Sequence, residues 1–251
     1  MEKLSPNEMK LMTELNRKAG IILPRQFIGM TVTMPDGNVL FDKTEPGHSY
    51  VRNYYNMVWG MSAVKNLSDS SFGAGYMSLK DTAGNVHAMP NGVVVGGAQN
   101  YTISVISCDT LDTNNPLNYG GTGILAQSTF ATYGIQVGLG TNPYSFEDYK
   151  VQTLVANGTG ANQLLVAASG LHNPSYNAGT LTWTDTVSRY WNNNGSGNVV
   201  IGETGLVCGI LGSAYTTYLI LMSHDVLGAT VTVPPAGQLK VTYTTTMVMP
   251  F

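Results

Sequence analysis

Apolar residues recur with two different spacings along this chain, and each spacing predicts a different kind of element. Near the N-terminus they recur every three or four positions after Ser5-Pro6-Asn7-Glu8, which has the sequence of a capped helix start. Gly20 is a natural stop. We therefore predict an amphipathic helix over residues 6–19, whose apolar side carries Met9, Leu11, Met12 and Leu15.

This helix is too short to be stable alone, so its apolar face needs another surface. That surface is either the chain's own β body or a neighbouring subunit. We interpret residues 1–26 as an N-terminal helical arm and residues 27–251 as the body. On the docking interpretation, Met9, Leu11, Met12 and Leu15 make assembly contacts.

The body begins with a predicted hairpin over residues 27–42 and a second helix at about 49–64. In that helix Val51, Tyr54, Tyr55 and Val58 form a stripe, which we interpret as core packing, with Arg52, Asn53 and Asn56 opposite. From residue 75 onward strands dominate. They are expected at 76–80, 86–89, 101–107, 134–139, 180–191, 198–211, 215–224, 229–233 and 238–249.

The last third of the chain gives the clearest strand pattern. Residues 180–187 and 240–244 alternate polar and apolar, which buries one face only. Residues 206–211 and 218–222 are nearly continuous apolar runs, typical of strands covered on both sides. Together they predict a mainly β protein, an antiparallel jelly-roll-like β-sandwich with the N-terminal helix and one or two small helices.

One of those small helices is predicted to start at Ser145, because Ser145-Phe146-Glu147-Asp148 has a capping pattern, and to end near Val155. The preceding Gly138-Leu139-Gly140-Thr141-Asn142-Pro143 lacks the Lys and third Gly of nucleotide-binding motifs. We interpret it as a loop.

Composition narrows the function classes. Charged residues are 11% of the chain, and residues 1–50 hold 12 of the 27, so the other 201 residues share only 15. A surface with so few charges suggests a body covered by copies of itself or by partners. With a net charge of −3 and no basic run, nucleic acid is not an expected partner. No apolar stretch reaches membrane-spanning length, and the charged N-terminus is unlike a signal peptide, so we expect no membrane insertion and synthesis in the cytoplasm.

Residues for catalysis or metal binding are scarce. His48, His87, His172 and His224 lack ligand spacing, and His224-Asp225 is interpreted as a turn after a strand. Cys108 and Cys208 are interpreted as small buried hydrophobes. We expect no metal, cofactor or catalytic residue. Glu203 is the one acid that merits inspection, with a structural hydrogen bond favoured over catalysis.

A glycan contact is the other candidate site. Trp191, Asn192 and Asn193 have the composition of a carbohydrate surface. They also fit the end of a strand followed by an Asn-Gly turn, which is the favoured interpretation.

Residues 130–251 contain a series of turn and strand signatures in a characteristic order. They are Gly134–Thr141, Phe146–Tyr149, Ser188–Gly197, Val199–Leu206, His224–Leu227, Val231–Gly237 and Val241–Tyr243, with a weaker echo at Gly47–Tyr55. This order resembles virion structural proteins of tailed bacteriophages. The resemblance implies a setting and a fold, and it carries no catalytic residue.

The expected function is therefore that of a structural subunit of a phage particle, such as a capsid decoration or a tail or fibre component, made in the host cytoplasm and located in the virion. Its expected partners are itself, as a homo-oligomer with a trimer as first guess, and other virion proteins. The alternative is a glycan-binding module of a phage appendage, which contacts a host surface glycan. A polysaccharide-degrading enzyme is the third hypothesis, and it needs two carboxylates facing one cleft.

Overall fold

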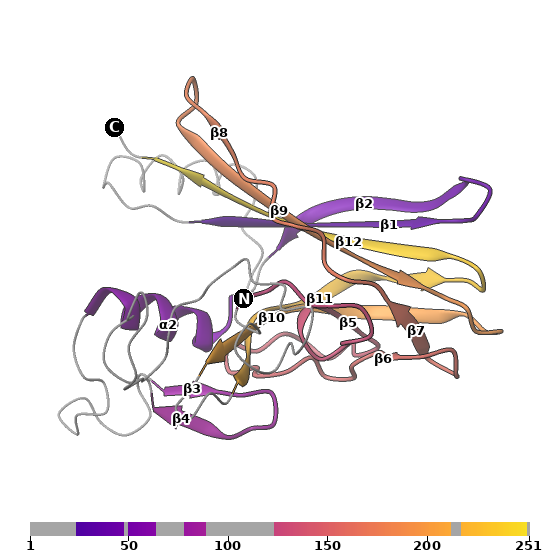
Figure 1. Cartoon of the computed structure of the whole chain (residues 1–251), viewed down its shortest axis with the longest axis horizontal. Coiled ribbons are helices and arrows are strands. Elements are labelled where there is room, and N and C mark those ends of the chain that lie inside the picture. The colour runs from indigo at the N-terminus through magenta and orange to yellow at the C-terminus, as the bar shows by residue number, and fades with distance from the viewer. Residues whose placement is uncertain (1–23, 48–49, 64–77, 89–122, 212–216, 250–251) are drawn as a thin grey trace.

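The protein is mainly β, with almost no helix, in a computed structural model that describes residues 24–47, 50–63, 78–88, 123–211 and 217–249 (Figure 1). Its elements are β1 (Arg25–Thr33), β2 (Val39–Gly47), α2 (Arg52–Ala63), β3 (Ser78–Lys80), β4 (Val86–Ala88), β5 (Gly134–Gly138), β6 (Ala156–Asn157), β7 (Gln163–Val166), β8 (Ser175–Asn177), β9 (Thr182–Asn192), β10 (Val199–Leu211), β11 (Thr217–Val233) and β12 (Gln238–Val248).

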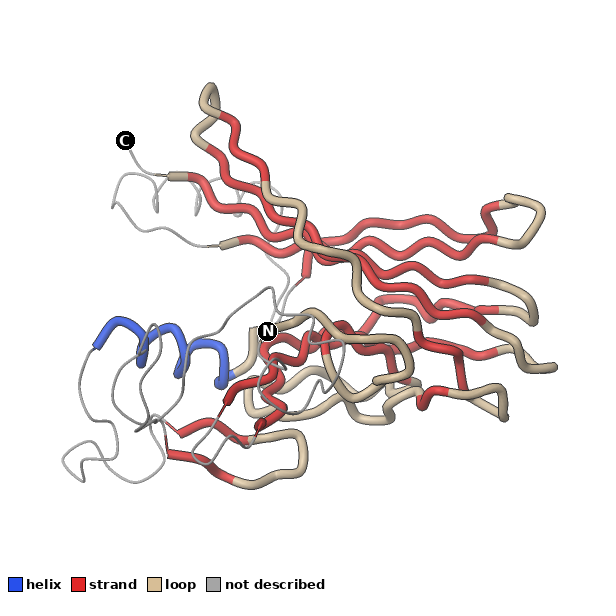
Figure 2. The backbone as a smooth tube through the Cα atoms, in the orientation of Figure 1, coloured by secondary structure: helices blue, strands red, loops and turns tan. Residues whose placement is uncertain are grey.

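Most of these strands form two sheets that face each other, as the red strands of Figure 2 show. The larger sheet has the order β2-β1-β12-β9-β7-β6, with β8 paired to β9, and the smaller has the order β11-β10-β5. All pairs within them are antiparallel except β6 with β7. The prediction of an antiparallel β fold of sandwich type is confirmed.

The alternating sequences explain how the sheets pack. In β12, Leu239, Val241 and Tyr243 are buried while the residues between them are partly exposed. The register places Tyr243 between Ile28 of β1 and Val187 of β9, so three strands present one apolar face. That face meets apolar side chains of the smaller sheet, namely Ile135, Val137, Ile201, Leu206, Val231 and Val233. Burial of this shared core is the main stabilising contribution to the sandwich.

The smaller sheet is also covered on its other side. Val207 and Leu221 pack with Val51 and Val151, which lie before α2 and in the loop after β5. This second layer explains the continuous apolar runs in β10 and β11, because both faces of these strands are buried.

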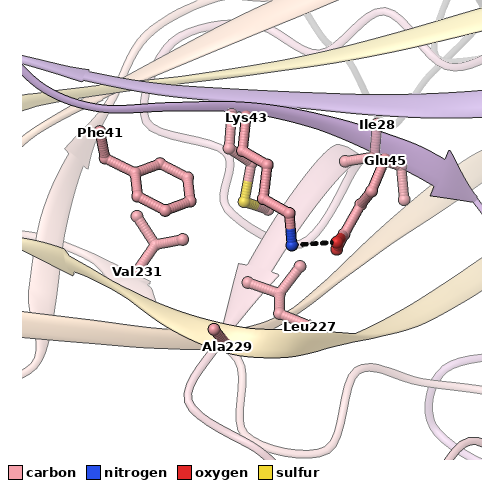
Figure 3. A pocket seen from close by; sticks show the side chains of 8 residues that line it. Ile28, Phe41, Lys43, Glu45, Leu227, Ala229 and Val231 are labelled. Atoms are coloured by element: carbon pink, nitrogen blue, oxygen red, sulfur yellow. Dashed lines mark hydrogen bonds and ion pairs between the residues drawn. The ribbon is translucent and has the colours of Figure 1, made fainter.

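One edge of the sandwich is open, between β2 and β11. Phe41, Lys43 and Glu45 point from β2 toward Leu227, Ala229 and Val231, across a small cleft (Figure 3). Lys43 Nζ lies 2.6 Å from Glu45 Oε2. Charged side chains on an edge strand discourage pairing with a strand of another chain. We therefore interpret the ion pair as protection of this edge.

Two predicted elements differ from the structure. The strands expected at 215–224 and 229–233 are one strand, β11, and His224-Asp225 lies inside it rather than in a turn. The helix expected from Ser145 does not form. Its cap does, since Ser145 N donates to Asp148 Oδ2 and Glu147 N donates to Ser145 Oγ, but the chain continues as turns.

The helix predicted at about 49–64 is α2. Val51 and Tyr54 of the predicted stripe pack in the core, as expected, but Asn53 and Asn56 of the opposite side are buried as well. Asn53 Nδ2 donates to Lys80 O at 2.9 Å and its Oδ1 accepts from Lys80 N at 2.9 Å, while Asn56 Nδ2 donates to Ser78 O. These asparagines bind β3, whereas Tyr55 of the predicted core stripe is 51% exposed.

The first strand, β1, begins at Arg25, two residues before the start of the predicted hairpin. The expected helix and its assembly contacts Met9, Leu11, Met12 and Leu15 lie outside the described residues, as do the strand expected at 101–107, His48 and Cys108. Cys208 is buried in β10, as expected.

Candidate functional site

Glu203 lies at the centre of a buried polar cluster. It is fully buried in β10, next to a register irregularity between Ile201 and Glu203. Oε1 accepts hydrogen bonds from Gly140 N at 2.9 Å and Thr153 N at 2.8 Å, and Oε2 accepts one from Gln152 N at 2.9 Å. Glu203 therefore holds two segments of the loop between β5 and β6.

His224 of β11 completes the cluster and is also fully buried. Its Nε2 is 2.7 Å from Glu203 Oε2 and its Nδ1 is 2.7 Å from Asp148 Oδ2. Both contacts are hydrogen bonds only when both ring nitrogens carry a proton, because carboxylates only accept. The geometry thus selects an imidazolium between two carboxylates.

The pKa values shift in the directions that this pairing requires. Burial alone would lower the pKa of His224, but hydrogen bonds to Glu203 and Asp148 outweigh burial and raise it. Burial alone would raise the pKa of Glu203, but hydrogen bonds from His224 and three backbone amides lower it. Each shift favours the charged form of its residue.

Glycines allow the loop to approach Glu203. A Cβ atom at Gly140 would lie 2.5 Å from Glu203 Oε1 and 2.5 Å from Gln152 Oε1, and one at Gly138 would also clash with Glu203. Gly138 is the last residue of β5 and the predicted loop follows it, and both Gly138 and Gly140 make room for a buried carboxylate.

Arg189 of β9 is a second buried charge, which the sequence reasoning did not single out. Its Nε, Nη1 and Nη2 atoms donate to five backbone carbonyls, namely Gln127 O, Phe130 O, Tyr133 O, Ile135 O and Ala167 O, at 2.6–3.0 Å. Burial lowers the pKa of Arg189 to about 9, so the guanidinium stays charged at neutral pH. The sequence does contain a sign of this burial, because Arg189 lies between Val187 and Trp191 on the core-facing side of an alternating strand.

The candidate glycan contact at Trp191 is contradicted. Trp191 is 1% exposed and belongs to the core between the sheets. Asn193 is fully buried and donates to Gly197 O and Val233 O at 2.8 Å, which shapes the turn after β9. Asn192 is partly exposed and accepts from Gln238 Nε2. The favoured interpretation, a strand end followed by a turn, describes these residues.

The other described histidines each pair with one carboxylate. His87 Nε2 is 2.7 Å from Asp81 Oδ2, and His172 Nδ1 is 2.5 Å from Asp185 Oδ2. Among the residues that the structure describes, no three His, Cys, Asp or Glu side chains gather as metal ligands. No described helix is long and apolar enough to cross a membrane.

Exposed aromatic rings gather instead beside the start of α2. Tyr55 is 51% and Phe146 38% exposed, and their ring centroids are 5.8 Å apart. Tyr55 also contacts the stacked pair Tyr50 and Tyr54 edge-on. Arg52 forms a two-pronged ion pair with Glu147 and lies over the Phe146 ring, 5.3 Å from its centroid. We call Tyr55, Phe146, Arg52 and Glu147 the aromatic patch.

Comparison with known proteins found no relative of this chain. No protein-family model, curated protein or solved structure matches the chain.

Proposed function

We propose that this protein is a structural subunit of a bacteriophage particle, which assembles through subunit contacts without catalysis. The observation that carries the proposal is the small number of charges left for the surface. Of the 15 charged side chains beyond residue 50, Asp81, Arg189, Glu203 and Asp225 are buried. A body so poor in surface charge is weakly protected against association, which suits a surface that other subunits cover.

The buried charges support the same proposal. Arg189 donates only to backbone carbonyls, and Glu203 binds three amides and His224, so these charges fix loops to strands. Glu203 and Asp148 flank one histidine, but Glu203 has no exposed surface for a substrate to reach. This arrangement favours a scaffold over a glycosidase, which needs two accessible carboxylates.

The proposal also covers the type of sandwich, the location and the assembly. We propose a jelly-roll type of sandwich, a virion location after synthesis in the host cytoplasm, and a homo-oligomer, with a trimer as first expectation. Because the Lys43–Glu45 pair protects the β2 edge, we expect subunits to meet through faces or through the N-terminal arm and not by continuing the larger sheet.

Antibody labelling of purified particles in the electron microscope tests the proposal. Regular labelling at one position on the particle supports it and also identifies the part to which the subunit belongs. Particles that stay unlabelled, when the same antibody binds the denatured protein from the same preparation, contradict it.

A second candidate function, glycan binding, rests on the aromatic patch. Rings of Tyr and Phe can stack on the apolar face of a sugar, and the adjacent Arg52–Glu147 pair offers planar polar groups with no net charge. This combination suits a neutral polyhydroxyl ligand. Binding on a glycan array that Tyr55→Ala and Phe146→Ala abolish supports this function. The control is Tyr176→Ala on β8, which removes a 56% exposed tyrosine elsewhere. Equal loss in the control, or no binding by the original protein, rejects it.

A further inference from the structure

The loop between β5 and β6, residues 139–155, lies on the outer face of the smaller sheet. Its Val151 side chain packs on Val207 of β10 and Leu221 of β11. Two polar connections fasten it: Glu203 binds its two ends through backbone amides, and His224 binds its middle through Asp148. We call residues 139–155 the covering loop.

We propose that protonated His224 is a charge clamp that holds the covering loop on the sheet, and that loss of one ring proton loosens the loop and uncovers the apolar face beneath it. A neutral imidazole has one nitrogen with a lone pair and no proton. That nitrogen would face a carboxylate oxygen at 2.7 Å, so one attraction becomes a repulsion. The remaining negative charge of Glu203 would then be buried without a cation beside it.

The groups around His224 come from each element packed against it. Glu203 faces it from β10 and Asp148 from the covering loop. Asp225 follows His224 in β11. Tyr144 interacts with Asp148 and Asp225, Tyr243 interacts with Asp225 and Tyr50, and the Arg52–Glu147 pair adjoins Asp148 in the covering loop. Burial raises the pKa of Tyr144 to about 12 and also raises those of Tyr50 and Tyr243. These tyrosines therefore stay neutral while His224 titrates.

The direction of the pH effect follows from the two shifted groups. The pKa of His224 is higher in the folded protein than its ordinary value, so its contribution is complete below about pH 6.5 and is lost as the pH rises through the folded value. The pKa of Glu203 is lowered, so its contribution is present above about pH 4.3 and is lost on further acidification. Both contributions are complete between about pH 4.3 and pH 6.5, so the covering loop is held on the sheet there. The loop loosens when the pH rises through the pKa of His224 in the folded protein.

Hydrogen exchange of the full chain from pH 6 to pH 10, corrected for the intrinsic pH dependence, tests the clamp together with NMR of the His224 ring nitrogens. We expect both nitrogens to be protonated at pH 6. We also expect protection of the Gly140, Gln152 and Thr153 amides to fall about tenfold or more with the His224 midpoint, the size of one lost charge-assisted hydrogen bond. A neutral His224 at pH 6 overturns the proposal, as does protection that changes no more than in β9 and β12.

Variants separate the clamp from general stability. His224→Gln should lower protection of the three amides already at pH 6 and remove its pH dependence. Should that variant not fold, Asp148→Asn keeps the Glu203–His224 pair and should weaken protection of the loop alone. His87→Gln is the control, because His87 also pairs with a carboxylate but is no part of the clamp. It should leave protection of the covering-loop amides unchanged. Unaltered loop protection in Asp148→Asn or in a folded His224→Gln contradicts the clamp.

Discussion

At the residue scale, the main finding is that buried charges act on the backbone. Glu203 could be singled out from the sequence because an acid stood in an apolar stretch. Its partners could not, since Asp148 and His224 are 55 and 21 positions away and the covering loop brings them together only in the fold. Trp191 was a glycan candidate because polar residues follow it, but its place in the alternating strand buries it, in agreement with the favoured interpretation of a strand end followed by a turn.

Arg189 allows a direct test of this role. Arg189→Met removes the donor of hydrogen bonds to five carbonyls, so we expect a loss of at least about 3 kcal/mol in the free energy of unfolding. Denaturant unfolding of both proteins measures it. Lys240→Met, on the neighbouring strand, is the control and should change stability by less than about 0.5 kcal/mol. Equal stability of the two variants would show that the Arg189 contacts are dispensable.

At the element scale, the long strands were predictable, whereas the loop after β5 and the short strands β6, β7 and β8 were not. Alternation in β9 and β12, and continuous apolar runs in β10 and β11, follow directly from which faces are buried. The capping pattern at Ser145 is local and does form, but Gln152 and Thr153 donate their amides to Glu203 and so cannot donate within a helix. A distant side chain thereby overrides a local helix signal.

Gly140 of the covering loop provides the test at this scale. Gly140→Ala places a methyl group against Glu203 and Gln152, so we expect it to destabilise the protein by about 1–3 kcal/mol. Thermal unfolding checks this. Gly197→Ala is a matched control, because no atom lies within 4 Å of its added methyl group. Should both substitutions shift the unfolding temperature equally, close approach to Glu203 is not what Gly140 provides.

At the scale of the whole molecule, charge is concentrated in the first 50 residues and sparse in the remaining 201. The fold class could be predicted from the pattern of apolar and polar residues alone. Assembly contacts could not, because the sequence of one chain does not identify the proteins that its surface contacts. The predicted arm offers one such surface.

Deleting residues 1–20 tests the arm. On the docking interpretation the truncated body keeps its unfolding temperature within a few degrees, but enters particles less well, because the apolar face of the helix is lost. Leu11→Asp together with Leu15→Asp should have the same effect. Calorimetry and the amount of protein in particles measure the two outcomes. A truncated chain that unfolds or aggregates by itself would place the arm in the core of the body.

The central claim, that the protein is a structural part of a phage particle, is tested most directly by quantitative mass spectrometry of particles purified through a density gradient. The claim predicts that this chain follows the major capsid protein through the gradient at a constant ratio and stays bound after washing in high salt. Recovery of the chain only in fractions without particles would contradict it.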